Sequence, residues 1–151
     1  MAQDRKQATR KVWLDTLSRH RKGYEGPDSE AYWASSVDAA SRDEIIAIQN
    51  DKLEALGPFL YENSNFYRRR FDRLGLTASD IQTIDDLHKW PVINKQEMIE
   101  DALANPPYGT YQTIVDADWV ERGWMLFSSS GSTGTPRVFR YTHVDREYWQ
   151  W

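Results

Sequence analysis

The sequence contains no cysteine, which excludes disulfide bonds, a thiolate nucleophile and any metal site built on cysteine. Long apolar runs are missing too. The strongest of them, such as residues 124–127, extend over about four residues, whereas a membrane-spanning helix needs about 20. Residues 1–11 are polar and charged, unlike the apolar stretch of a secretory signal. We therefore expect a cytoplasmic protein that does not enter a membrane.

Charge of either sign is not scarce, but it is unevenly spread. With 151 residues, of which 40% are hydrophobic and 13% aromatic, the chain can bury a core and is not of the disordered class. The net charge is −4, yet residues 1–22 carry +5, so the remainder carries −9. An acidic body repels phosphate backbones, so nucleic acid is not an expected partner. The basic start is either an arm for an acidic partner or a solvated helix face, and the second is favoured.

The first two-thirds of the chain favour helices. Apolar spacing predicts a short helix over residues 5–22, interrupted by the glycine- and proline-containing stretch 23–29. A longer helix is predicted to begin at Ser41, a good N-cap residue. Within it, Gly57-Pro58 is expected to bend or break the helix before its end.

A further helix is predicted over residues 65–74, with Gly75 as the glycine that follows a helix end. Its polar side is rich in arginine, namely Arg68, Arg69, Arg70 and Arg73. Such a cluster suits phosphate binding, but the opposite face is aromatic. A solvated face or an ion-paired interface is therefore the favoured interpretation.

The last third changes character. Helix-start boxes at Thr77, Thr83 and Asn94 punctuate a run of short helices. β-Branched and aromatic residues then predict strands over 110–115, 124–127 and 138–142, and a helix begins near Asp145. The predicted fold class is α/β, as an α+β arrangement with a helical N-terminal region followed by strand–loop–strand. The expected domains are a basic extension or linker (1–40), a helical subregion (41–109) and the start of an ATP-binding β-region (110–151).

Aromatic residues continue to the end of the sequence, at Tyr148, Trp149 and Trp151. Tryptophans in the middle of an element need a surface to pack on. The chain is therefore expected to be part of something longer or to dock onto another chain.

The segment between the last two predicted strands is the most informative. It combines hydroxyl side chains with glycines, whose backbone N–H groups can form a concave anion-binding nest. The candidate phosphate ligands are Ser129, Ser130, Gly131, Ser132, Thr133, Gly134, Thr135 and Arg137. Charge-assisted hydrogen bonds contribute about 1.5–3 kcal/mol each, so several could hold a triphosphate.

The loop does not match several other motifs that are rich in glycine and serine. The Walker spacing Gly-x4-Gly-Lys-Ser/Thr is absent, and Ser130 stands where a nucleophile elbow needs glycine. His143 and Asp145 are near in sequence, but that proximity makes no catalytic triad. The Gly131–Gly134 spacing is similar to the KH-domain clamp, which joins helices and not strands. A serine- and glycine-rich surface loop without a ligand remains an alternative that composition alone favours.

The order of motifs adds a family resemblance. Ser129-Ser-Gly-Ser-Thr-Gly-Thr-Pro-Arg137 resembles the phosphate-binding motif of adenylate-forming enzymes, Ser/Thr-Ser-Gly-Thr-Thr-Gly-x-Pro-Lys. Ser132 replaces a threonine and Arg137 the usual lysine, so a hydroxyl and a cation are kept. Upstream, Tyr61–Tyr67, Phe71–Gly75 and Asp86–Pro91 followed by Lys95 look like phenylacetate–coenzyme A ligases.

The resemblance implies a two-step ligase reaction that uses ATP, Mg²⁺ and coenzyme A. A small carboxylic acid, expected to be aromatic, is adenylated with release of pyrophosphate, and the thiol of coenzyme A then displaces AMP. The resemblance covers roughly residues 42–148 and includes neither the metal-binding acid nor the catalytic lysine of the family. The chain alone is therefore expected to be inactive, with the remainder of the enzyme in the same or a second chain.

Three hypotheses follow from the sequence. The first is the N-terminal portion of an aryl- or acyl-CoA ligase, which could also form a homodimer. The second is an adenylating enzyme that does not use coenzyme A, similar to acyl-protein synthetases. The third is a helical interaction module that keeps the loop without catalysis.

Overall fold

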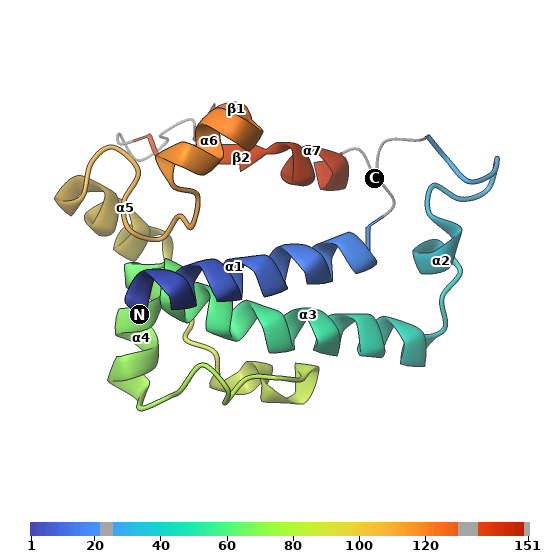
Figure 1. The fold of residues 1–151 in the computed structure, drawn as a ribbon, viewed down its shortest axis with the longest axis horizontal. Coiled ribbons are helices and arrows are strands. Elements are labelled where there is room, and N and C mark those ends of the chain that lie inside the picture. Colours follow the sequence, from blue (N-terminus) through green and yellow to red (C-terminus); the bar gives the residue numbers. More distant parts are fainter. Residues whose placement is uncertain (22–25, 130–135, 150–151) are drawn as a thin grey trace. The chain divides into compact units, whose positions relative to one another are not determined.

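The computed structural model describes residues 1–21, 26–129 and 136–149 (Figure 1). The chain divides into two compact units. The first comprises Met1–Asn63 and Arg68–Pro91, and the second comprises Ser64–Tyr67 and Val92–Trp151.

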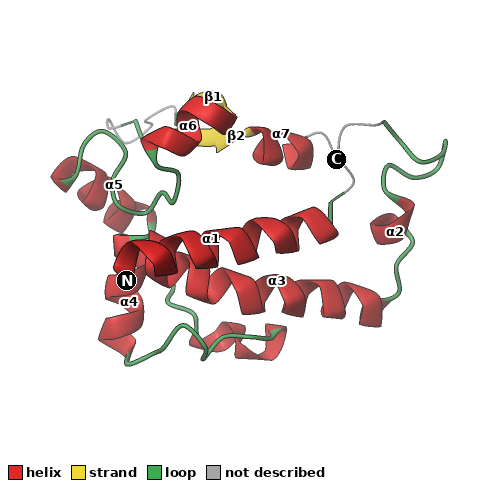
Figure 2. Cartoon of the chain, in the orientation of Figure 1, coloured by secondary structure: helices red, strands yellow, loops and turns green. Residues whose placement is uncertain are grey.

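The first unit is helical. It contains α1 (Ala2–Arg19), α2 (Ser35–Asp38), α3 (Arg42–Asn63), most of α4 (Asn65–Leu74) and the 3₁₀ helix η1 (Ile84–Lys89). The second unit contains α5 (Lys95–Ala104), α6 (Asp116–Arg122), β1 (Gly123–Ser128), β2 (Val138–Thr142) and α7 (His143–Trp149). The two strands pair antiparallel, with Ser128 opposite Val138 (Figure 2). A helical N-terminal region followed by strand–loop–strand confirms the predicted fold class.

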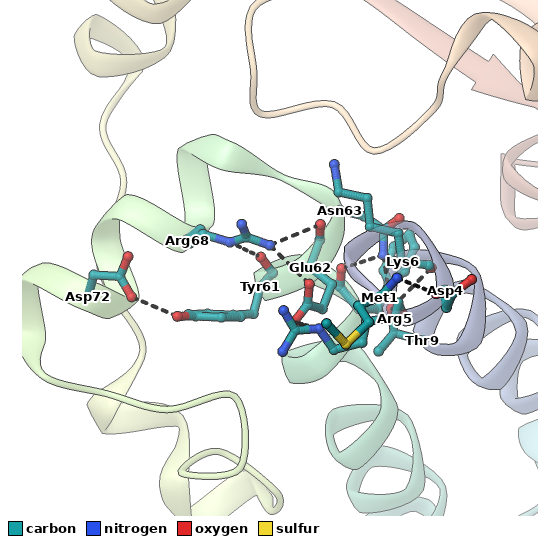
Figure 3. Close-up of polar contacts among 11 residues, drawn as sticks. Met1, Asp4, Arg5, Lys6, Thr9, Tyr61, Glu62, Asn63, Arg68 and Asp72 are labelled. Atoms are coloured by element: carbon teal, nitrogen blue, oxygen red, sulfur yellow. Dashed lines mark hydrogen bonds and ion pairs between the residues drawn. The ribbon is translucent and has the colours of Figure 1, made fainter.

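Helix α1 runs alongside α3 (Figure 1) and is held there largely by polar contacts. The Asn63 amide donates to the Thr9 hydroxyl at 3.1 Å, and Arg10 donates to the Asn63 side-chain oxygen at 3.1 Å. Trp13 stacks on Phe59 with ring centroids 5.8 Å apart. Figure 3 shows Asn63 between Lys6 and Thr9 of α1. One side of α1 is therefore an interface with α3, while Arg5 and Lys11 keep 71% and 77% of their side-chain surface exposed, as the interpretation of a solvated face predicts.

The other end of α1 meets Asp51 of α3. Arg19 donates to both Asp51 carboxylate oxygens at 3.1 and 3.0 Å, and the His20 ring lies 2.5 Å from one of them. The His20 contact has the largest effect and lowers the pKa of the Asp51 carboxyl; burial opposes it, and Arg19 lowers the pKa further. The ion pair therefore links the two helices most strongly while Asp51 is ionised.

Asp51→Asn is expected to destabilise the protein by up to about 1 kcal/mol at neutral pH, because a partly exposed ion pair contributes little. Since the folded-state pKa of Asp51 is lowered, its contribution is present above the unfolded pKa of about 3.9 and is lost as the pH falls through the folded value. Urea unfolding of wild type and Asp51→Asn at pH 7 and below pH 4 measures this. A difference that grows in acid would contradict the assignment.

The predicted break at Gly57-Pro58 does not occur, because α3 continues through both residues to Asn63, while the alternative outcome of a bend stays a prediction. A proline inside a helix costs about 3 kcal/mol. Here the neighbouring turn is buried: Phe59 is 6% exposed and packs on Trp13. Gly57 is in close approach to the chain at Ala78, whose carbonyl oxygen would lie 2.7 Å from an added Cβ. Packing on both sides therefore offsets the lost hydrogen bond.

Phe71 of α4 is the centre of an aromatic cluster in the first unit. It is fully buried and meets the rings of Tyr61 and Trp90 edge-on, at centroid distances of 6.0 and 5.6 Å. The helix ends as predicted, with Gly75 at φ +67° and the Leu76 N–H donating to the Phe71 carbonyl at 3.0 Å.

Among the arginines of α4, Arg68 lies in an interface with the end of α3. Arg68 Nε donates to the Tyr61 carbonyl at 2.8 Å, and its guanidinium contacts the Glu62 carboxylate at 3.1 Å (Figure 3). Arg70 is 7% exposed. The ion-paired interpretation therefore fits Arg68 better than a phosphate site does.

Most of the predicted helix starts are confirmed. Ser41 pairs with Glu44, and the Asn94 side chain accepts from the Glu97 N–H at 2.9 Å at the start of α5. The Thr83 box begins η1, a 3₁₀ helix. At Thr77 the prediction of a helix is wrong: its box closes only a turn, in which the Asp80 carboxylate accepts from the Thr77 hydroxyl at 2.7 Å.

The predicted strand over 110–115 is also wrong, because this segment is irregular. Side-chain bonds replace a strand ladder: the Gln112 amide donates to the Val138 carbonyl at 2.7 Å and accepts from the Arg140 N–H at 3.3 Å. The sequence analysis did not anticipate α6, which follows at once. Acids in its first turn and the Asp118–Arg122 pair at 2.9 Å support that helix.

No helix in the ranges that the structure describes combines the length and hydropathy that a bilayer crossing requires.

Candidate functional site

The predicted phosphate loop lies between β1 and β2. Of its eight candidate ligands, Ser129 and Arg137 are among the described residues. Ser130, Gly131, Ser132, Thr133, Gly134 and Thr135 lie outside them. The geometry of the site is therefore that of its two ends and of the residues beneath them.

The two ends of the loop are joined by a reciprocal pair of hydrogen bonds. The Ser129 N–H donates to the Arg137 carbonyl at 2.9 Å, and the Arg137 N–H donates to the Ser129 hydroxyl oxygen at 2.9 Å. This pair continues the β1–β2 ladder one step beyond Ser128 and Val138. The strands therefore bring the first and last candidate ligands together, and the Ser129 hydroxyl already serves as an acceptor at the base.

The Arg137 guanidinium has only weak partners. One terminal nitrogen lies 3.5 Å from the Met98 sulfur, and the guanidinium carbon is 5.3 Å from the centre of the Phe139 ring. Its Nε is buried without a hydrogen-bond partner. Among the described residues, no carboxylate lies within ion-pair distance of it. A cation in this state can accept an anionic ligand.

Arg140 on β2 provides a contrast. Its guanidinium contacts the Asp116 carboxylate at 2.7 Å, donates to the Ile114 carbonyl, and lies 4.1 Å from the centre of the Tyr108 ring. Its side chain is 7% exposed. Arg140 is therefore neutralised within the protein and fixes the irregular segment to β2.

An aromatic layer supports the loop base. Tyr111 is 7% exposed and contacts the rings of Phe66 and Phe139, each at a centroid distance of 6.0 Å. Its hydroxyl is buried without a hydrogen-bond partner. Burial raises the pKa of this hydroxyl, while the nearby Gln112 amide and the charge of Arg137 act in the opposite direction. Tyr111 is thus within electrostatic range of the Arg137 cation.

Sequence reasoning missed Met98 and Tyr111. Met98 stands on the predicted helix that begins at Asn94, and Tyr111 in the segment taken for a strand. Neither position carries a motif. Met98 contacts Arg137 across 39 positions of sequence, and Tyr111 contacts Phe139 across 28, so no local pattern predicts either contact.

Alternative sites are weaker. A pocket of about 120 Å³ in the first unit is lined partly by Arg19, His20 and Ser36. It is smaller than the roughly 300 Å³ that small-molecule sites need, and Arg19 and His20 are engaged with Asp51. Within the part of the chain that the structure describes, no group of three or more metal-ligating side chains is assembled, so no residue is assigned to Mg²⁺.

Comparison with known proteins gives sequence relatives of one kind, although no family model matches the chain. Phenylacetate-coenzyme A ligases from Escherichia coli K12 and Aromatoleum evansii are 35% and 34% identical over 113 residues. Those residues make up 75% of this chain and 24% of each relative. The chain thus spans about a quarter of the length of these relatives. The predicted resemblance is confirmed.

Solved structures of 2-hydroxyisobutyryl-CoA ligase share the fold. The open conformation, in complex with 2-HIB-AMP and CoA, matches with a TM-score of 0.68 and 22% identity over 82% of this chain and 27% of that chain. The thioesterification state matches with a TM-score of 0.69 and 24% identity over 82% of this chain and 25% of that chain. The chain therefore shares the fold of part of 2-hydroxyisobutyryl-CoA ligase.

Proposed function

Because the chain matches phenylacetate–coenzyme A ligases over three-quarters of its length, we propose that it forms the N-terminal portion of an ATP-dependent, AMP-forming aryl- or acyl-CoA ligase. The observation that carries this proposal is the similarity of sequence. The closed loop base, with a guanidinium that has no carboxylate partner among the described residues, supports it. The loop from Ser129 to Arg137 is proposed to bind the β- and γ-phosphates of ATP.

The proposed reaction has two steps. A carboxylate oxygen of the acid attacks the α-phosphorus of Mg-ATP, forming an acyl-adenylate as the bond to pyrophosphate breaks. The thiol of coenzyme A then attacks the acyl carbon, forming a thioester as AMP leaves. Fixed donors and a cation at the leaving pyrophosphate stabilise the charge that develops on it. In this chain, those groups are the loop amides and hydroxyls and Arg137.

Coenzyme A is proposed as the acceptor because the similar solved structures hold both an acyl-AMP and CoA. A thioester product, detected by mass spectrometry, separates this reaction from adenylation without CoA. An interaction module without catalysis would show no response to nucleotide. The substrate is proposed to be a small aromatic carboxylic acid, and Mg²⁺ to accompany the ATP.

The rest of the catalytic machinery is proposed to come from the remainder of the enzyme, in the same or a second chain, so the chain alone is expected to be inactive. We further propose that the enzyme is cytoplasmic and that it can form a homodimer. The proposed domains of this chain are residues 1–40, 41–109 and 110–151. None of these regions is proposed to bind nucleic acid.

Replacement of Arg137 by glutamine is expected to lower ATP–pyrophosphate exchange about tenfold to a hundredfold, because one charged hydrogen-bonding group contributes about 1.5–3 kcal/mol. Arg137→Lys keeps the cation and should retain much of the exchange. The measurement uses the longest natural polypeptide that contains residues 1–151, with a panel of aryl acids.

The matched control for this experiment is Ser128→Ala, which removes an exposed hydroxyl next to the loop and should leave exchange unchanged. Gly131→Val should abolish exchange, since a side chain would fill the proposed nest. Full exchange in the Gly131→Val, Arg137→Gln double variant would rule out the loop as the phosphate site. A wild-type protein inactive with every acid would argue against the ligase itself.

A further inference from the structure

The cation at the loop exit is surrounded by groups that cannot neutralise it. Met98 from α5 and Phe139 from β2 contact it, and Tyr111 from the irregular segment packs on Phe139 with ring centroids 6.0 Å apart. We call Met98, Phe139 and Tyr111 the arginine cage. A thioether is a weak acceptor, and an aromatic face attracts a guanidinium without cancelling its charge. The cage orients Arg137 and leaves its charge uncompensated.

We propose that Met98 and Tyr111 are positioning residues that keep Arg137 free of a counter-ion, so that its charge is reserved for a polyphosphate. This inference rests on the proposed function of the loop and adds two residues to the site that lie outside its motif. Their role is to act through Arg137, and neither needs to touch the nucleotide.

The physical reason lies in the cost of partial burial. A guanidinium that is partly removed from water without a carboxylate partner is less well solvated than one at the surface. An anion that approaches it gains more than it would from a hydrated or already paired arginine, since the local dielectric is lower. Arg137 Nε and the Tyr111 hydroxyl are buried without a hydrogen-bond partner, as is Arg140 Nε, so the two arginines differ in their carboxylate contacts and not at Nε.

Arg140 on β2, three residues after Arg137, is held in the opposite way. Asp116 lies 2.7 Å from its guanidinium, and the Ile114 carbonyl accepts from it. A carboxylate therefore lies beside the arginine that links the irregular segment to β2. At Arg137, the corresponding contact is made by the uncharged Met98.

Met98→Glu tests the proposal by supplying the missing counter-ion. Position 98 lies in the first turn of α5, where the helix dipole favours an acidic side chain, so the fold should tolerate the change. The Kd for Mg-ATP of the longest natural polypeptide containing this chain is expected to rise by about tenfold or more, because the new carboxylate competes for Arg137. Met98→Gln, with nearly the same shape and no charge, separates the effect of the charge from that of losing the thioether, and its Kd is expected to stay well below that of Met98→Glu.

A second measurement does not depend on the stability of a variant. With ¹⁵N-labelled arginine, the Nε–H signal of Arg137, assigned by its loss in Arg137→Lys, should shift when tripolyphosphate is added. The signal of Arg140 should not, because its charge is already paired. Thermal unfolding of both Met98 variants accompanies the titrations, so that a loss of folding is not read as a loss of binding.

The outcomes separate the two proposals. If the wild-type polypeptide binds neither Mg-ATP nor tripolyphosphate, the phosphate loop itself is refuted. If it binds them and folded Met98→Glu matches Met98→Gln, or the Arg137 signal is unmoved, the arginine cage is refuted and the loop stands. Weaker binding by Met98→Glu than by Met98→Gln, with an Arg137 shift in wild type, is the expected result.

Discussion

Replacement of Phe71 by alanine is expected to lower the free energy of unfolding by about 3–5 kcal/mol, the range found when a buried aromatic side chain is deleted from a core. Phe71 has no exposed surface and contacts Tyr61 and Trp90 edge-on. Its ring therefore joins α3, α4 and the segment after η1, and no neighbour can fill the space without moving one of these elements. Total stabilities of single domains are about 5–15 kcal/mol, so the variant should be largely unfolded on mild heating.

The control for this variant is Leu74→Ala on the same helix. Leu74 is 54% exposed, and its truncation should change the free energy of unfolding by less than about 1 kcal/mol. Urea denaturation followed by tryptophan fluorescence gives the unfolding midpoints, and Trp90 of this cluster is one of the seven tryptophans that contribute to the signal. Equal midpoints for Phe71→Ala and Leu74→Ala would mean that this cluster is not a core of the first unit.

The sequence was most informative where the signal is local. Ser41 and Asn94 cap helices as predicted, and Gly75 takes the positive φ that its place after a helix requires. Each of these is decided by residues within one turn of the position in question. The two paired strands were likewise predictable, because their β-branched and aromatic residues flank a glycine-rich turn.

The wrong predictions concern residues whose state depends on distant partners. Gly57-Pro58 breaks an isolated helix, but burial around Phe59 and close approach to Ala78 keep α3 continuous. The segment 110–115 has the composition of a strand, yet the Gln112 side chain takes the hydrogen bonds that a third strand would have made to β2. Propensity is a weak guide where tertiary contacts are this strong.

The candidate site also has one part that the sequence predicts and one part that depends on distant residues. The loop motif is contiguous, so Ser129 and Arg137 could be named from the sequence, and the structure joins them at the loop base. Whether an arginine is neutralised depends on what the fold places beside it. Arg137 and Arg140 are three positions apart and look alike in the sequence, while only Arg140 has a carboxylate partner among the described residues.

Gly109→Ala is expected to destabilise the second unit by about 2–4 kcal/mol, from two sources that add. Gly109 has φ +70°, a conformation that costs free energy for any residue with a side chain. An added Cβ would also lie 2.6 Å from the Tyr111 ring and 2.7 Å from an Asp101 carboxylate oxygen. Neither can retreat easily, because Asp101 accepts from the Thr110 hydroxyl at 2.7 Å and Tyr111 is packed between aromatic rings.

Gly75→Ala separates the two sources. Gly75 has nearly the same φ, +67°, but no atom lies within 4 Å of an added Cβ, so only backbone strain of about 1 kcal/mol is expected. Chemical denaturation of both variants gives the difference, which measures the clash at Gly109. Because Tyr111 belongs to the arginine cage, Gly109→Ala should also weaken Mg-ATP binding under conditions where it stays folded, and Gly75→Ala should not. Equal losses of stability would show that the turn at Gly109 yields, and that the fold does not hold Tyr111 as tightly as its contacts imply.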